Sequence, residues 1–430
     1  MKVLIISNNA VSSTQNNGKT VKSFFKNLPN ESLAQLYFGT NEDPDTSVCS
    51  TFYRITEIDI FKSILKLKFS TSNTHNKLIS SKKKHNLKDN RLLSFVKKHK
   101  KSTALLRELL WSFNTWDTKE LNDWILNFKP DVIFAVLGGN IYSHRIVMTI
   151  SKRYSIPFVS FYTDDYIIND TSKNYFQKCH YNLLCKTYKK SIFKSSLCYV
   201  IGEKMRKDYS AIFKTPFNTL VNAVDVSMFS LIDKTEIDIT KPIIISFIGG
   251  IHLNRWKSIC KLGKLFNELN EENNWNIQLN VYTVKEPDEE ILQAFNKSYI
   301  SYKGGLEYDE VLVTIKKSHF LLHVESFDKE NRLYTKYSIS TKIPEYLASN
   351  RGIIAYGPEE IASIEIFKDN NFGYCLPDNT KIAKQIVVEA INDYNTYDFE
   401  RMRNYSFKKY NQEIVSTELL DNLVRIASSK

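Results

Sequence analysis

Cysteines are few in this sequence, and their spacing argues against two ways of stabilising a chain. The six of them lie scattered, without a CxxC pair or a pairing pattern: Cys49, Cys179, Cys185, Cys198, Cys260 and Cys375. This spacing argues against a disulfide framework and against a zinc site. Unpaired thiols are typical of a reducing compartment, so we expect a cytoplasmic protein.

Long apolar runs are also missing. No stretch approaches the roughly 20 apolar residues that a membrane-spanning helix needs. The N-terminal run MKVLIISNN is short and is typical of a buried strand rather than of a targeting segment. We therefore expect a protein that is soluble, or attached only peripherally to the inner face of the cell membrane.

Two familiar phosphate-binding motifs are absent. The segment PIIISFIGG ends in Gly249 and Gly250, but it lacks the GxGxxG spacing of dinucleotide-binding turns. The segment SNNAVSSTQNNGKT lacks the GxxxxGK(S/T) spacing of a P-loop. Neither a dinucleotide-binding turn nor a P-loop is therefore predicted.

Acidic residues are almost absent from one segment. Between Phe61 and Arg107 there are fourteen Lys and Arg residues and one acid, Asp89, so this segment carries +13 of a total charge of +12. Interleaved apolar residues indicate amphipathic helices, and we interpret residues 61–113 as a basic insertion. Residues 61–107 would suit an anionic membrane surface, although a solvated lysine-rich face is an alternative. Nucleic acid is disfavoured, because the segment lacks a recognisable reading motif.

The remaining pattern predicts two α/β domains. With 430 residues, 42% of them hydrophobic, the chain is long and apolar enough for two cores. Short β-branched runs alternate with longer amphipathic ones, as in parallel sheets crossed by helices. The expected strands are residues 2–7, 34–37, 131–136, 158–162, 197–201, 219–221, 242–249, 277–283, 300–302, 320–324, 352–355 and 373–375. With a hinge at 222–242, we expect domains at 1–222 and 223–398, and a C-terminal helix within 399–430 that packs back toward the first domain.

The segment SISTKIPEYLAS, residues 338–349, suggests an anion site. If Ser340 caps a helix, then Thr341, Lys342 and the next residue offer unpaired N–H groups at its first turn. Free donors, a hydroxyl and a lysine at a helix N-terminus bind anions, and a diphosphate would fit. Glu345 is expected on the open side of this helix, with a solvated first-turn acid as the alternative explanation.

A second phosphate-binding candidate follows the strand that ends at Gly249 and Gly250. Two glycines after a strand let the backbone approach a ligand closely, and the guanidinium of Arg255 can fork onto phosphate oxygens. The glycine pair alone is a weak signal, so the prediction depends on the arginine.

Two loops of the first half carry further candidates. Asn17 and Gly18 are expected to form a turn after the first strand, with Lys19 beginning a helix, and an ordinary βα turn is the alternative. Asp164 and Asp165 follow another strand, where paired acids suit general-base work or orientation of a hydroxyl. A helix cap would explain either acid equally well, and two adjacent acids without further ligands make a poor metal site.

Together these segments resemble the GT-B glycosyltransferases, in particular the family 4 type of bacterial capsule and O-antigen assembly. The likeness is carried by VLIISNN with NNGKT, FKPDVIFAVLGG, SFYTDDY, VNAVD, FIGGIHLNR and STKIPEYLAS followed by IIAYGPEEIAS. It implies two Rossmann-like domains with parallel sheets facing a central cleft, the first binding the acceptor and the second a nucleotide sugar. It also implies that Arg255 contacts the donor diphosphate, that the turn from Ser340 to Lys342 cradles it, and that Glu345 binds the ribose hydroxyls.

The sequence departs from the family in two places. Family 4 typically has two glutamates separated by seven residues, but the residue eight positions before Glu345 is Tyr337. Glu325, after the strand at 320–324, is the candidate to take over part of that contact with the sugar. Asp164 and Asp165 stand near where the family's histidine of the first domain is expected. Both changes leave open whether the transfer retains or inverts the anomeric configuration.

The resemblance implies a hexosyltransferase-like enzyme. It would move sugar from a nucleotide-diphosphate sugar to a glycan or a polyprenyl-diphosphate-linked acceptor in surface polysaccharide synthesis. Such enzymes usually work without a bound metal, so we expect neither a metal nor a cofactor besides the donor. The candidate catalytic residues are Asp164, Asp165 and Glu325. The alternatives are a nucleotide-sugar epimerase of the same fold, a non-catalytic partner subunit and, less favoured, a nucleic-acid-binding protein.

Overall fold

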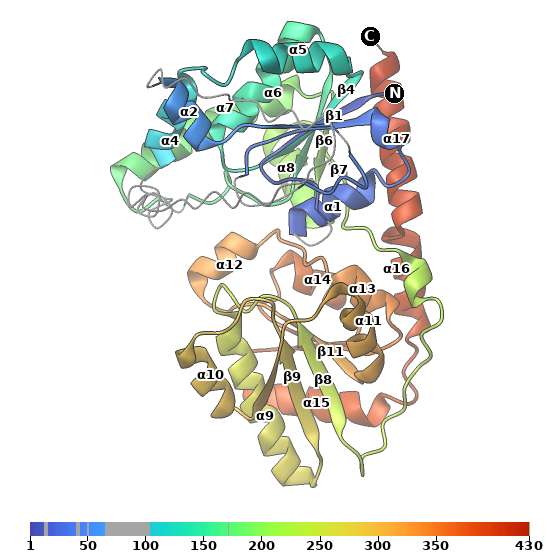
Figure 1. Cartoon of the computed structure of the whole chain (residues 1–430). Helices are drawn as coiled ribbons and strands as arrows, with labels where there is room; N and C mark the ends of the chain where they lie inside the picture. The colour runs from blue at the N-terminus through green and yellow to red at the C-terminus, as the bar shows by residue number, and fades with distance from the viewer. Residues whose placement is uncertain (13–15, 40–43, 50, 65–103, 171, 430) are drawn as a thin grey trace, which may run out of the picture. The chain divides into compact units, whose positions relative to one another are not determined.

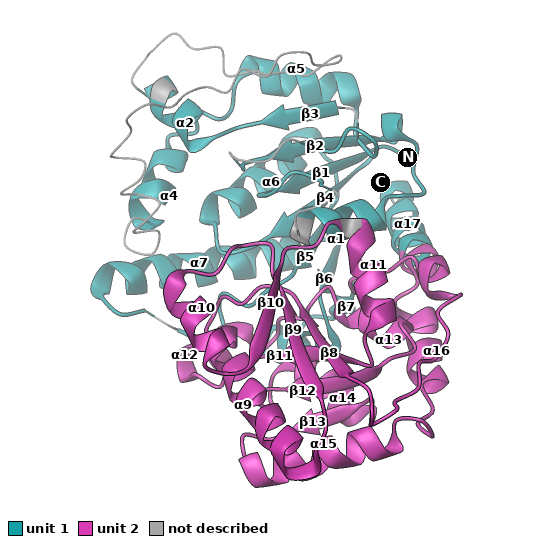
Figure 2. Cartoon of the chain, turned by 60° about the horizontal axis from the view of Figure 1, so that its bottom comes forward, with its two compact units in different colours: residues 1–220, 416–430 teal, residues 221–415 magenta. Residues whose placement is uncertain are grey.

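A computed structural model shows two α/β units (Figures 1 and 2). Unit 1 comprises residues 1–220 together with 416–430, and unit 2 comprises residues 221–415. The structure describes residues 1–12, 16–39, 44–49, 51–64, 104–170 and 172–429.

Among the described residues, unit 1 is built on a seven-stranded sheet with the strand order β3-β2-β1-β4-β5-β6-β7. Every pairing in it is parallel. The strands are β1 (Val3–Ser7), β2 (Leu33–Tyr37), β3 (Thr51–Arg54), β4 (Val132–Leu137), β5 (Phe158–Tyr162), β6 (Leu197–Val200) and β7 (Asn218–Thr219). Each residue of β1, β2, β4 and β5 is buried, so both faces of the central sheet are covered.

The helices of unit 1 connect these strands in βαβ order. They are α1 (Asn16–Phe24), the 3-10 turn η1 (Asn30–Ser32), α2 (Glu57–Ile64), α4 (Ala104–Ser112), α5 (Lys119–Phe128), α6 (Ile141–Tyr154), α7 (Tyr175–Lys194) and α8 (Glu203–Phe213). Most of α17 (Gln412–Ser428) also belongs to this unit, where Ser416 Oγ donates to the carbonyl of Phe24 at 2.8 Å.

Unit 2 repeats the same plan on a six-stranded parallel sheet in the order β10-β9-β8-β11-β12-β13. Its strands are β8 (Ile243–Ile248), β9 (Ile277–Tyr282), β10 (Ile300–Gly304), β11 (Phe320–Val324), β12 (Gly352–Tyr356) and β13 (Tyr374–Leu376). Its helices are η2 (Val226–Phe229), α9 (Arg255–Asn273), α10 (Glu289–Asn296), α11 (Tyr308–Lys317), α12 (Lys329–Thr335), α13 (Ile343–Ala348), α14 (Ala362–Asp369), α15 (Thr380–Asp393) and α16 (Glu400–Lys409).

Helix starts follow the expected capping chemistry in both units. The Thr118 hydroxyl accepts from Leu121 N before α5, and the Asp288 carboxylate accepts from Ile291 N before α10. Each satisfies one of the amides that the first turn of a helix leaves without a backbone partner.

The structure confirms all the strands expected from the sequence, with ends that differ by at most two residues. It adds β3, which within the described part of the chain pairs with β2 alone. It also places the start of α1 at Asn16, so the expected turn at Asn17 and Gly18 is wrong and both belong to the helix. The fold is therefore α/β, with two parallel sheets in separate units.

Candidate functional site

The strand order of each unit defines where a ligand can bind. In unit 2 the chain order runs outward from β8 in both directions, to β9 on one side and to β11 on the other. Ligands of open α/β sheets bind beyond the carboxyl ends of the strands at such a switch point. The loops that meet there are residues 249–254, after β8, and residues 325–328, after β11. In unit 1 the corresponding loops follow β1 and β4.

An ion pair joins these two loops of unit 2. Arg255 Nη2 donates to both carboxylate oxygens of Glu325, at 2.9 and 3.0 Å, and Nε donates to Oε2 at 3.2 Å. The Glu325 side chain is 2% exposed and that of Arg255 is 15% exposed. Asn254 Nδ2 also donates to Asp328 Oδ2, at 2.5 Å. The switch point therefore holds a guanidinium fixed along one edge by a buried carboxylate.

The backbone that delivers Arg255 is unusual. Leu253 and Asn254 both have positive φ values, 57° and 60°. A leucine in the left-handed region is rare and costs roughly 1 kcal/mol or more, and such residues cluster at functional sites. Two consecutive left-handed residues thus precede the arginine at the start of α9.

A buried polar cluster lies behind the ion pair. His323 Nε2 lies 3.0 Å from Ser363 Oγ and 3.8 Å from Glu325 Oε1, and Ser258 Oγ donates to the Glu325 carbonyl at 3.0 Å. Burial raises the pKa of Glu325, although Arg255 and a hydrogen bond with Ser363 oppose that shift. Burial, helped by the charge of Arg255, lowers the pKa of His323 to about 3. His323 is therefore neutral and serves as a hydrogen-bonding group.

The glycines after β8 differ in what they make possible. A Cβ on Gly250 would lie 2.5 Å from the His252 ring, whereas one on Gly249 would make only ordinary contact with Phe247. The His252 ring in turn lies against Arg255, with Nε2 3.4 Å from Nη1. Burial and the charges of Arg255 and Lys285 lower the pKa of His252. Gly250 therefore makes room for a neutral ring at the remaining edge of the guanidinium.

Helix α13 differs from the sequence prediction in two respects. Its capping position is Lys342, not Ser340. Lys342 N donates to Ser340 Oγ at 3.2 Å and Ile343 N to the Ser340 carbonyl at 3.2 Å, so two of the three amides expected to be open are used within the turn around Thr341. The predicted cradle of backbone donors is thus wrong for these two residues, because the serine turn satisfies them first.

The expected exposure of Glu345 is also wrong. All six residues of α13 are buried, because the helix packs on α16. Glu345 Oε2 accepts a 2.9 Å hydrogen bond from Lys342 Nζ, and the lysine side chain is 22% exposed. Tyr346, one residue further on, hydrogen-bonds through its hydroxyl with the backbone of Ile248 at the end of β8. This contact ties α13 to the end of the strand that leads to Arg255.

In unit 1 the two aspartates after β5 have different surroundings. Asp165 Oδ1 accepts from the amides of Ile167 and Ile168, each at 3.1 Å, and from the Tyr209 hydroxyl at 2.8 Å. Asp164 Oδ2 accepts from the neighbouring Thr163 hydroxyl at 3.2 Å. Asp165 therefore shapes its own turn and orients a buried tyrosine, which is the structural explanation that the sequence left open.

The loop after β1 explains why residue 18 is a glycine. A Cβ at this position would lie 2.5 Å from the Ala10 carbonyl and 2.8 Å from Ser12, so α1 approaches the loop too closely for a side chain. Lys19 follows within α1 and is half-buried. The side chain of Asn17 lies outside the described residues.

Sequence reasoning missed the buried residues His323, Ser363 and Ser258, whose roles depend on contacts made through space. The run LLHVES carries the only local signal, a histidine inside an apolar strand before an acid. In unit 1 it also missed His144, whose Nε2 faces the Gly138 carbonyl at 3.0 Å and whose Nδ1 faces Ser191 Oγ at 2.8 Å. Burial lowers the pKa of His144 to about 4.

The basic insertion is described only at its margins. Of residues 61–113, the structure describes 61–64 and 104–113, and the predicted membrane contact of residues 61–107 otherwise lies outside the described residues. In the described part of the chain, no helix is both long and apolar enough to cross a membrane. Nor do three or more His, Cys, Asp or Glu side chains gather there as a metal site would require.

Comparison with known proteins identifies the fold. No family model matches the chain, and no curated protein matches its sequence. Among solved structures, a glycosyltransferase from Rickettsia africae is similar over 100% of both chains, with a TM-score of 0.59 and 11% identity. A UDP-forming α,α-trehalose-phosphate synthase from Burkholderia xenovorans, solved with glucose-6-phosphate, is similar over 98% of this chain and 100% of its own, with a TM-score of 0.60 and 9% identity.

A third similar structure was solved together with ligands. It is a TarM variant from S. aureus solved with fondaparinux, α-GlcNAc-glycerol and UDP, and it matches 98% of this chain and 100% of its own, with a TM-score of 0.58 and 10% identity. At these identities the likeness establishes the fold: the chain has the GT-B architecture of glycosyltransferases. The narrower family 4 assignment stays a prediction.

Proposed function

We propose that the protein is a glycosyltransferase that moves a hexose from a nucleotide-diphosphate sugar to a glycan or a lipid-linked glycan, in the synthesis of a bacterial surface polysaccharide. Two of the similar structures support the donor class, since one protein is UDP-forming and another was solved with UDP. The observation that carries the proposal is the guanidinium of Arg255, held at the switch point of unit 2 by buried Glu325.

The geometry of Arg255 suits it to one role in the donor site. Glu325 engages Nε and Nη2, and Nη1 is paired with His252, which leaves the second hydrogen of Nη1 to donate to a phosphate oxygen of the donor. Glu325 then serves as a positioning residue that fixes the guanidinium plane, in place of the sugar contact expected from the sequence. Removing the guanidinium would therefore remove a contact with the donor phosphate.

The pair formed by Lys342 and Glu345 supplies the second half of the proposed site. Lys342 lies at the start of α13, with Ser340 and Thr341 in the turn before it, and its ammonium has three donors, so it can stay on Glu345 and also donate to the diphosphate. A carboxylate has about four lone-pair positions, so Glu345 can hold the lysine and also accept ribose hydroxyls. Gly249 and Gly250 are the first residues of the loop that leads from β8 to Arg255.

The reaction breaks the bond between the anomeric carbon and a phosphate oxygen, and it forms a bond from the acceptor oxygen to that carbon. Negative charge builds on the departing diphosphate, and a preorganised donor such as Arg255 or Lys342 contributes roughly 3 kcal/mol to its stabilisation. The acceptor proton passes to a general base, or to the leaving phosphate if the configuration is retained. Asp164 and Asp165 are the candidates for that base, and Asp165 in addition holds a turn and Tyr209.

Product analysis tests this proposal. The full-length protein is incubated with UDP- and GDP-sugars and a polyprenyl-diphosphate-linked saccharide, and the products are separated by mass. Release of nucleoside diphosphate together with a new glycoside is the expected result. An isomerised sugar without a glycoside would show an epimerase instead and would contradict the proposal.

One observation favours a second candidate, a non-catalytic partner subunit. The residue at the position of the family's first glutamate is Tyr337, which is 1% exposed. A buried tyrosine offers no carboxylate to a sugar. Donor binding without any turnover, in the presence of every donor and acceptor tested, would support this candidate over the enzyme.

A further inference from the structure

Helix α4 of unit 1 is apolar on its outer face as well as on its inner one, while its charged residues Arg107 and Glu108 are half-buried and buried. Its inner face packs Ala104 and Trp111 into the unit, while Leu106, Leu109 and Phe113 recur at helical spacing on the opposite side. These three outer side chains are 55%, 55% and 58% exposed. A surface helix normally carries polar residues on its outer face, so the outer face of α4 is suited to an apolar environment outside unit 1.

The beginning of α7 adds aromatic side chains to the same end of unit 1. Tyr175 and Phe176 are 76% and 67% exposed. The two helices pack on each other, and His180 Nε2 of α7 lies 3.9 Å from Glu108 Oε1 of α4. Phe176 lies one turn before His180 and therefore on the side of α7 that meets α4. Figures 1 and 2 show α4 beside the N-terminal end of α7.

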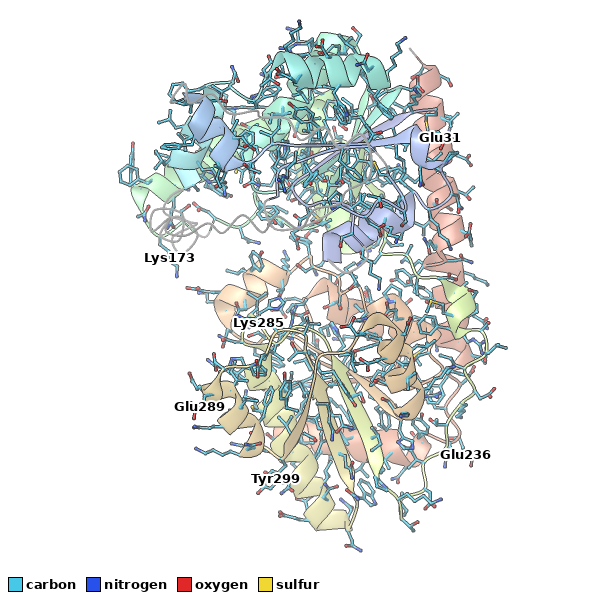
Figure 3. The ribbon with its side chains drawn as sticks, in the orientation of Figure 1. Glu31, Lys173, Glu236, Lys285, Glu289 and Tyr299 are labelled. Atoms are coloured by element: carbon cyan, nitrogen blue, oxygen red, sulfur yellow. The ribbon has the colours of Figure 1, made fainter. Side chains whose placement is uncertain are left out.

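Lysines dominate the charge around these aromatic residues, although Lys178 is ion-paired with Asp170, which stands just before them in the chain. From residue 173 to residue 194 there are six lysines and no acidic residue, and every one of these lysines is exposed: Lys173, Lys178, Lys186, Lys189, Lys190 and Lys194. Lys173, labelled in Figure 3, marks the same end of the unit. The sequence that leads into α4 is basic as well, with a net charge of +13 over residues 61–107. Lysine is depleted at the core of protein interfaces but gains free energy beside anionic lipid.

We propose that the outer face of α4 and the N-terminal end of α7 form a docking surface for an anionic lipid bilayer. This surface consists of Leu106 and Leu109 of α4, Phe113 directly after α4, and Tyr175 and Phe176 of α7, with Lys173 and Lys178 beside the aromatic residues of α7. The apolar and aromatic side chains enter the interface between headgroups and acyl chains, and the lysines lie against the charged headgroups. The proposal does not depend on the function proposed above.

Vesicle co-sedimentation of the full chain tests the surface. Vesicles of phosphatidylcholine mixed with phosphatidylglycerol are compared with pure phosphatidylcholine, at low and high salt. A variant with Leu109→Ser, Phe113→Ser and Phe176→Ser removes the apolar contact. Its matched control is Leu231→Ser with Val284→Ser, which removes two side chains of unit 2 that are 87% and 88% exposed.

A second pair of variants tests the charge. Lys173→Gln with Lys178→Gln removes the lysines that flank the aromatic residues of α7, and Lys297→Gln with Lys381→Gln neutralises two exposed lysines of unit 2. We expect the α7 variant to bind about fivefold more weakly for each lysine removed, and the unit 2 variant to bind like the wild type. Thermal unfolding of each variant shows whether its fold is kept.

We expect the wild type to bind the anionic vesicles only, and more weakly at high salt. The three serine substitutions should reduce this binding at least about tenfold, whereas the Leu231→Ser, Val284→Ser control should bind like the wild type. Three results would overturn the proposal. They are no binding to anionic vesicles, equal binding by the wild type and the triple-serine variant, and a concentration-dependent dimer that the triple-serine variant dissolves. The last would show that a second copy of the chain covers this face.

Discussion

Replacing Arg255 by alanine tests the ion pair at the switch point of unit 2. Arg255→Ala leaves the Glu325 carboxylate 2% exposed and without its counter-ion. Breaking a buried pair from one side costs about 3–5 kcal/mol. Unit 2 runs from residue 221 to residue 415, and in a domain of this size 1 kcal/mol shifts the unfolding temperature by about 2–4 °C. We therefore expect its transition to fall by about 6–20 °C near neutral pH.

The matched control removes both charges. Arg255→Met with Glu325→Gln replaces the pair by uncharged side chains of similar size, which is often close to neutral for stability. Differential scanning calorimetry of the ligand-free protein compares the single variant, the double variant and the wild type. We expect the double variant to regain most of the stability that Arg255→Ala loses.

Acidification provides a second signature of the same variant. Burial raises the folded-state pKa of Glu325 above 4.5, and Arg255 opposes that shift, so its removal raises the pKa further. A carboxyl with a raised folded-state pKa contributes stability that is full below the unfolded-state pKa and is lost as pH rises through the folded-state pKa. The deficit of Arg255→Ala should therefore shrink as pH falls toward 4.5. A variant within about 1 kcal/mol of the wild type at neutral pH would refute the reasoning, because an unpaired buried carboxylate cannot cost so little.

Three further predictions concern unit 1. Burial lowers the folded-state pKa of His144 to about 4, so the stability that its neutral form contributes is full above pH 6.5 and is lost as pH falls toward 4. Urea unfolding of the wild type should therefore show a loss of up to about 3 kcal/mol over this range. A His144→Gln variant should lack that loss. Gly18→Ala should destabilise the protein by about 1–3 kcal/mol, because its Cβ would lie 2.5 Å from a backbone carbonyl. The control Gly249→Ala should unfold like the wild type. Equal urea midpoints for the two variants would contradict the close packing of α1. Asp164→Asn should lower the transfer rate by about 10²–10⁴ if this residue is the base, while Asp165→Asn keeps its acceptor oxygen and most of the rate; the reverse order in a kinetic assay would exchange their roles.

The strands were predictable because apolar β-branched runs of the right length mark a sheet buried on both faces. β3 was missed, since Thr51–Arg54 is a short edge strand with half-buried polar residues at both ends and a single neighbour. The start of α1 was misplaced because Asn17 and Gly18 are typical turn residues. Here residue 18 is helical and is nevertheless a glycine, because the preceding loop leaves no room for a side chain.

The candidate site was predictable residue by residue, but its pairings were not. Arg255 and Glu325 stand 70 positions apart, and only the neighbouring positions of β8 and β11 bring them together. Local pattern also placed Glu345 on an open helix face, whereas packing of α13 on α16 buries it beside Lys342. Helical periodicity shows on which face of a helix a residue lies. Whether that face is exposed to solvent depends on which other elements of the fold pack against it.

Nucleoside diphosphate binding by unit 2 is the most direct test of the proposed diphosphate site at Arg255. UDP and GDP are titrated singly into the wild-type protein and into the Arg255→Met, Glu325→Gln double variant, with unfolding temperature as the readout. A ligand at 100 times its Kd stabilises by about 2.7 kcal/mol, so at least one of them should raise the unfolding temperature of the wild type and leave that of the double variant unchanged. The same shift in both proteins, or none in the wild type, would contradict a diphosphate site at Arg255.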